Sequence, residues 1–101
     1  MKRYSRRLQD LVSVGPAMLG DFDRLGIGSV AELARFDPQA LYERLARVTG
    51  QRPDICVLDV FRAAVAQARN PRLPAEQSLW WWWSRKRHQA RPSRARAGRR
   101  R

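Results

Sequence analysis

Prolines and glycines divide this chain into short segments, and their positions restrict the fold more than any other sequence feature. Pro16, Pro38 and Pro53 each precede a run whose apolar side chains recur every three or four residues, as on one face of an α-helix. Proline is favoured in the first turn of a helix, because its φ is fixed and its missing N–H needs no partner there. Gly26 and Gly50 follow two of these runs and are typical helix ends. The pattern predicts short helices joined by tight turns.

The apolar spacing and the capping residues predict five or six helices, and no run alternates as a β-strand does. The expected helices cover residues 5–12, 16–25, 29–34, 38–49 and 53–68, with a last one from residue 75 that carries the tryptophans. One apolar stripe on each helix forms the expected core, which consists of Leu8, Leu11 or Val12, Met18 or Leu19, Phe22, Leu25, Val30, Leu33, Ala34, Leu41, Leu45, Val48, Val57, Val60, Phe61, Ala64 and Val65. The predicted fold class is all-α, with one domain over residues 1–83.

Most of the positive charge lies at the end of the chain. Of the net charge of +12, residues 84–101 contribute +9, because they contain nine Lys and Arg and no acidic residue. Arg, Ala, Ser and Pro have nothing apolar to bury there, so we expect a disordered basic tail over residues 84–101. Such a tail attracts nucleic acid or anionic lipid through counterion release.

The sequence also indicates the cellular compartment. The single cysteine, Cys56, rules out an internal disulfide and suits a reducing cytosol. The N-terminal stretch MKRYSRRLQDLV lacks the apolar core of a signal peptide, and no apolar run reaches the ~20 residues that cross a bilayer. We therefore expect a cytoplasmic protein.

No group of residues indicates an enzyme, a metal site or a cofactor. The only histidine, His88, lies in the basic tail, and Cys56 lies on an apolar helix, where a small buried hydrophobic side chain is the simplest interpretation. Asp54 and Asp59 are five residues apart and do not share a helical face. We expect Asp54 to cap a helix and Asp59 to be solvated. The sequence predicts no catalytic residue and no cofactor.

The stretch LVSVGPA, residues 11–17, resembles the turn of helix-hairpin-helix domains, in which a hydrophobic-x-Gly-hydrophobic-Gly turn joins two helices. The later stretches LGIGSVAELA, DPQALYERL and DICVLDVFRAAVAQA, followed by a tryptophan cluster, resemble the pathogenicity-locus family in the same order. These are small bacterial helix-hairpin-helix proteins, some of them labelled mitomycin-resistance-like. The resemblance runs from about Leu8 to Trp83, and it implies the fold and DNA binding.

The turn from Val14 to Met18 is a candidate phosphate site. The first N–H groups of a helix have no intrahelical partner and lie at the positive end of the helix dipole. The amides of Gly15, Ala17 and Met18 therefore present donors to one phosphate oxygen, in a contact that reads no bases. The alternative interpretation is a turn that only packs two helices together.

Several residues near this turn depart from the usual DNA-binding pattern. Ser13 stands at the first hairpin glycine, and Ala17 stands where Lys or Arg is frequent. Asp21 and Asp23 repel a phosphate unless they face away from it. The basic residues that we expect to compensate for these departures are Arg3, Arg6, Arg7 and Arg24.

Four successive tryptophans, Trp80 to Trp83, cannot all be buried by one helix, since side chains step around it by about 100°. We expect Trp80 and Trp83 to close the core against Phe61 and Leu41. At least one of Trp81 and Trp82 is then exposed. Three roles remain open for the exposed rings: packing or a dimer contact, stacking on single-stranded nucleic acid, and membrane anchoring. The segment has little aliphatic surface, which argues against a membrane.

The leading hypothesis is sequence-independent nucleic-acid binding, most simply to DNA. The alternative is a protein–protein module or homodimer that uses the hairpin and the tryptophan surface. The predicted DNA-binding residues are Arg3, Arg6, Arg7, Val14, Gly15, Ala17, Met18, Arg85, Lys86 and Arg87, and the predicted stacking or partner residues are Trp81 and Trp82.

Overall fold

A computed structural model describes residues 6–99 of the chain and the side chains of residues 6–89. It contains two short 3₁₀ helices and five α-helices, and no strand occurs in the described range. In chain order these are η1 (Leu8–Asp10), α1 (Pro16–Leu25), α2 (Val30–Leu33), α3 (Pro38–Thr49), α4 (Ile55–Arg69), η2 (Ala75–Ser78) and α5 (Trp80–Arg99). The predicted all-α fold is confirmed. In this range no helix combines the length and the apolarity that a membrane span requires.

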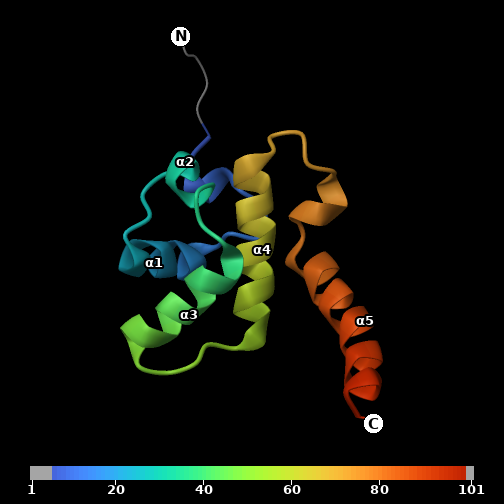
Figure 1. The fold of residues 1–101 in the computed structure, drawn as a ribbon. Helices are drawn as coiled ribbons and strands as arrows, with labels where there is room; N and C mark the ends of the chain where they lie inside the picture. Colours follow the sequence, from blue (N-terminus) through green and yellow to red (C-terminus); the bar gives the residue numbers. More distant parts are fainter. Residues whose placement is uncertain (1–5, 100–101) are drawn as a thin grey trace.

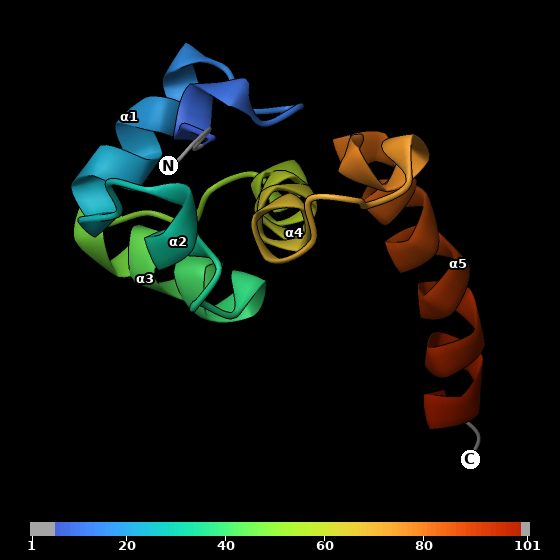
Figure 2. The same ribbon diagram turned by 90° about the horizontal axis from the view of Figure 1, so that it is seen from above.

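Helix α4 lies at the centre of the molecule (Figure 1). Seen along the axis of α4, helices α1, α2 and α3 lie on one side of it and α5 lies on the other (Figure 2). The core forms between α4 and the first group, where the rings of Phe22 and Phe61 stack with their centroids 5.9 Å apart. Helix α5 therefore packs against the side of α4 that faces away from α1, α2 and α3.

The predicted capping residues lie at the starts and ends of the helices, as expected. Pro16 and Pro38 occupy the first turns of α1 and α3, and Ser29 Oγ accepts the N–H of Glu32 at 3.1 Å. Gly26 and Gly50 are left-handed, with φ of 78° and 80°, a conformation that costs glycine no steric strain. Helix α4 begins two residues after Pro53, where Asp54 Oδ1 accepts the N–H of Cys56 at 2.9 Å.

Most of the predicted core is buried, with differences at helix ends. Leu11 is buried and Val12 is exposed, which settles the alternative that the sequence left open. The prediction for Val48 is wrong: its side chain is 52% exposed, because it lies in the last turn of α3, where residues 47–49 are all exposed to solvent. Val57 and Val60 are only partly buried against the core.

The first predicted helix is reduced to the single turn η1 (Leu8–Asp10). Beyond it the backbone becomes extended at Leu11, and Val12 pairs with the buried side chain of Gln67 instead of with a helical neighbour. The Val12 N–H donates to Gln67 Oε1 at 2.8 Å, and Gln67 Nε2 donates to the Val12 carbonyl at 2.8 Å. A contact with α4 therefore replaces the helical hydrogen bonds of this segment. Residues 1–5 lie outside the described range.

The end of the domain also differs from the predicted boundary at Ser84, because α5 continues to Arg99. Its first turns are fixed by Asp59, which is fully buried, so the expectation that Asp59 is solvated is wrong. Arg87 Nη2 donates to Asp59 Oδ2 at 2.9 Å, and Arg87 Nε lies 3.3 Å from both carboxylate oxygens. Residues 84–89 thus belong to the packed domain.

Ser13 is the only described non-glycine residue with positive φ, at 73°. Its Oγ donates to the Ser78 carbonyl at 3.0 Å and accepts the N–H of Trp80 at 3.1 Å. These two hydrogen bonds join the turn before α1 to the start of α5. They explain why serine is accommodated in a conformation that favours glycine.

Substitutions at Ser13 separate the contribution of its two hydrogen bonds from the cost of its left-handed backbone. We expect Ser13→Ala to lower the free energy of unfolding by about 1–3 kcal/mol, because two hydrogen bonds are lost while the left-handed backbone remains. Ser13→Gly loses the same hydrogen bonds but relieves the backbone, so its cost is smaller by about 1 kcal/mol. Urea unfolding measures both variants, and equal costs for Ala and Gly would contradict this interpretation.

Candidate nucleic-acid interface

The start of α1 (Pro16–Leu25) is open to solvent. Gly15 precedes the helix in an extended conformation, and no atom lies within 4 Å of the position that a Cβ would take there. Among residues 6–89, whose side chains the structure describes, no acceptor pairs with the N–H groups of Gly15, Ala17 or Met18. Met18 contributes only its amide, because its side chain is buried, and Val14 packs partly against the core. The turn thus presents backbone donors rather than side chains.

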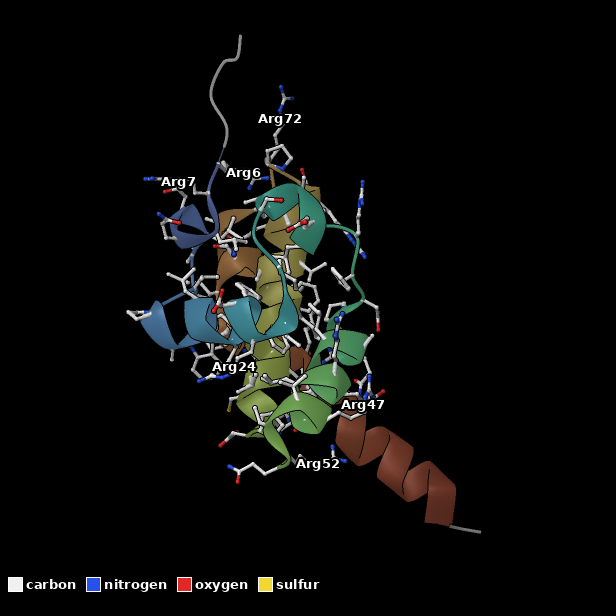
Figure 3. The ribbon with its side chains drawn as sticks, turned by 90° about the vertical axis from the view of Figure 1, so that its left-hand side faces the viewer. Arg6, Arg7, Arg24, Arg47, Arg52 and Arg72 are labelled. Atoms are coloured by element: carbon white, nitrogen blue, oxygen red, sulfur yellow. The ribbon has the colours of Figure 1, made fainter. Side chains whose placement is uncertain are left out.

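The acidic residues of α1 leave this end of the helix accessible. Asp21 forms an ion pair with Arg24, whose Nη1 lies 2.9 Å from Asp21 Oδ1. Asp23 is exposed two turns beyond Pro16. Figure 3 views α1 from its outer side, with Arg7 above the helix and Arg24 below it. Arg24 thus compensates the charge of Asp21, as the sequence predicts.

The basic residues before the turn have different roles. Arg6 is bound inside the fold: its Nη1 donates to the Gln67 carbonyl at 2.8 Å and its Nη2 to the Ala68 carbonyl at 3.4 Å. A cation there complements the C-terminal end of the α4 dipole. The structure thus gives Arg6 a role inside the fold and no support for its predicted DNA contact. Arg7 is exposed near α1 and stays a candidate, whereas Arg3 lies outside the described residues.

The bond between Ser13 and Trp80 brings the turn beside the first turn of α5 (Trp80–Arg99). Trp80 is 38% exposed there, so the prediction that it closes the core with Trp83 is wrong. Trp80 is the first residue of α5 and does not belong to the core cluster, in which Phe61 stacks on Phe22. Trp83 is half-buried, and its Nε1 donates to the Gln77 carbonyl at 2.8 Å.

Two tryptophans of α5 form cation–π pairs with basic residues one turn later. The Arg85 guanidinium lies 4.5 Å from the centre of the Trp81 ring, and the Lys86 ammonium lies 5.1 Å from that of Trp82. Arg85 and Lys86 are exposed, and neither has an acidic partner within the described residues. The first turns of α5 therefore present aromatic rings and uncompensated positive charge together.

Arg87 does not belong to this exposed set. Its side chain is largely buried against Asp59, and the hydrogen bond to that carboxylate raises the pKa of Arg87. Its charge therefore neutralises Asp59, and the structure offers no support for the DNA contact that the sequence predicts for Arg87.

Cys56 is half-buried at the start of α4, less enclosed than the sequence predicts. Burial raises the pKa of its thiol, and the hydrogen bond that Asp54 makes adds to the shift. The neutral thiol is the form that this environment favours. The backbone N–H of Cys56 in turn lowers the pKa of Asp54, which caps α4 as predicted.

Two comparisons relate the sequence of this chain to known proteins. Residues 2–89 match the family model described as Pathogenicity locus. The chain belongs to the pathogenicity-locus family. It is also 43% identical over 91 residues to a mitomycin resistance protein, McrB, from Streptomyces lavendulae. The aligned region covers 90% of this chain and 85% of the relative. No solved structure shows a significant match.

In this pathogenicity-locus protein, sequence analysis does not predict the structural roles of three polar residues near the candidate interface. Gln67 and Asp59 lie within the apolar pattern of α4, and Ser13 replaces a glycine of the hairpin. The sequence does contain one indication of these roles. A single acidic or amide side chain on a buried helical face needs a partner, since buried polar groups are nearly always hydrogen-bonded. That indication does not identify Arg87, Val12 or Ser78 as the partners.

Proposed function

We propose that this protein binds nucleic acid without sequence specificity, and that DNA is its main ligand. The observation that carries the proposal is the Ser13–Trp80 hydrogen bond, which joins the turn before the open amides of α1 to the first residue of α5, and the next turn of α5 carries Arg85 and Lys86. The amides of Ala17 and Met18 bind one phosphate, and Arg85 and Lys86 bind other phosphates of the same nucleic acid. The arginines that follow along the chain extend this contact.

Each of these contacts is to the backbone of the nucleic acid. Helix N-termini and basic side chains bind phosphate oxygens, which are the same at every base pair. Binding of this kind gains its free energy largely from the release of counterions and weakens steeply as salt rises. The family membership supports the fold on which this proposal rests.

A salt titration tests the proposal. We expect the full chain to bind two duplexes of unrelated sequence with equal affinity, because phosphate contacts carry no sequence information. The logarithm of the binding constant should fall linearly with the logarithm of salt concentration, by about 0.9 for each phosphate neutralised. Fluorescence anisotropy of labelled duplexes measures both quantities between about 50 and 200 mM salt.

Two outcomes count against the proposal. If neither the duplexes nor a single strand of the same length binds at low salt, the chain is no nucleic-acid-binding protein, and the exposed tryptophans are better explained as a surface for a protein partner. If binding is strong but independent of salt, phosphate neutralisation is not its source.

A further inference from the structure

The exposed side of α5 combines two kinds of side chain in regular order. Trp81, Arg85 and His88 are all exposed and follow one another at the spacing of one helical face. Trp82, Lys86 and Gln89 repeat the order one residue later. We call the face formed by Trp81, Arg85, Trp82 and Lys86 the aromatic–basic strip. Its Arg85–Trp81 and Lys86–Trp82 pairs hold each cation 4.5 Å and 5.1 Å from a ring centre.

The charge of this strip determines which partner fits it. Residues 80–89 contain no acidic side chain, and Arg87 is already neutralised by Asp59. Arg85 and Lys86 keep their charge, and more arginines follow from Arg91. A second copy of the chain would bring like charges together, so a polyanion is the complementary partner.

The apolar part of the strip distinguishes among polyanions. A helix that inserts into a lipid surface buries aliphatic and aromatic side chains together, and residues 80–89 contain no aliphatic side chain. The exposed apolar groups are flat indole rings, of which Trp81 is 42% exposed. Flat aromatic rings beside cations match a ligand that offers flat bases beside phosphates, because bases stack on aromatic side chains.

We propose that the aromatic–basic strip of α5 binds single-stranded nucleic acid, with an unpaired base stacked on Trp81 and the adjoining phosphates on Arg85 and Lys86. A base in a duplex is already stacked on its neighbours, so only an unpaired base can reach a ring on the side of a helix. The inference rests on the proposed function and deepens it: duplex and single strand share the phosphate contacts, and the strip favours the single strand.

Substitution of Trp81 in the full chain tests the inference. We expect Trp81→Ala to weaken binding of an oligothymidylate about tenfold, since stacking contributes most of the single-strand preference, and to leave duplex affinity unchanged. Trp81→Phe is the matched control, because it keeps a ring that stacks and should restore most of the affinity. Trp81 is exposed, so the urea midpoint of both variants should equal that of the parent chain.

The possible results separate this inference from the proposed function. If Trp81→Ala weakens neither nucleic acid, or both equally, the strip does not select single strands, while the proposed function persists. If the parent chain binds neither nucleic acid at low salt, both proposals fail. If tryptophan fluorescence shifts with phosphatidylserine vesicles but not with oligothymidylate, the strip binds lipid, and this inference is overturned.

Discussion

Replacing Arg87 by methionine should lower the free energy of unfolding by about 3–5 kcal/mol, the usual cost of leaving a buried charge without its partner. Asp59 is fully buried, and Arg87 provides its short hydrogen bonds, with Nη2 2.9 Å from Oδ2. The remaining cation, Arg62, lies 3.8 Å from Asp59 Oδ1 and is more exposed. Chemical denaturation of the parent chain and the variant measures the difference.

Two further variants make this prediction specific. Arg62→Met removes only the longer contact, so we expect it to cost less than about 1 kcal/mol, as for exposed ion pairs. The double variant Asp59→Leu with Arg87→Met removes both buried charges, and we expect it to recover most of the stability that Arg87→Met loses. If the double variant is no more stable than Arg87→Met, the loss comes from packing rather than from an unpaired carboxylate.

The second large effect concerns the arginines beyond Gln89. Residues 90–101 contain six arginines. Replacing all six by glutamine should reduce the salt slope of duplex binding by up to about 5 and weaken binding about 10³-fold near physiological salt. The full length is kept, and Arg87 remains, so the packed domain is unchanged. A cut after Trp83 would instead remove the partner of Asp59 and confuse loss of binding with loss of folding.

A control for this variant lies on the opposite side of α4. Arg44 and Arg47 are exposed on α3, which lies across α4 from α5 (Figure 2). We expect Arg44→Gln with Arg47→Gln to leave the salt slope unchanged. If this pair reduces the slope as much per charge as the six distal arginines do, binding follows net charge alone and no particular surface is involved.

Local sequence patterns predict the helices of this protein well because capping is decided within a few residues. Ser29 bonds to Glu32 and Asp37 bonds to Ala40, each three positions away, and Gly26 adopts its conformation alone. Such contacts can be read from spacing. The fold class and most helix limits follow from them.

The parts that sequence analysis misses depend on pairs far apart in the chain. Asp59 and Arg87 are separated by 28 residues, and Val12 and Gln67 by 55. From sequence alone, an acidic residue in an apolar helix is predicted to be solvated, because its partner is unknown. A basic residue such as Arg6 is likewise predicted to be free to bind a ligand, because its hydrogen bonds within the fold are unknown. The sequence therefore anticipates the open backbone donors at the start of α1, but it does not show that Arg6 and Arg87 are bonded within the fold.

The central claim is that the fold itself, and not only its basic extension, binds phosphate through the amides at the start of α1. Gly15 provides the direct test, because its extended backbone and open surroundings accept a side chain. Aspartate there caps the helix with its own carboxylate, which occupies the amides and repels phosphate, whereas alanine leaves the amides open.

The decisive measurement is duplex affinity at low salt in the chain that carries the six glutamines, compared between Gly15→Asp and Gly15→Ala. We predict that Gly15→Asp weakens binding about tenfold or more and lowers the salt slope by about 1, and that Gly15→Ala binds like its parent. Equal affinity for the two variants would contradict the claim, because the amides of α1 would then contribute nothing to binding.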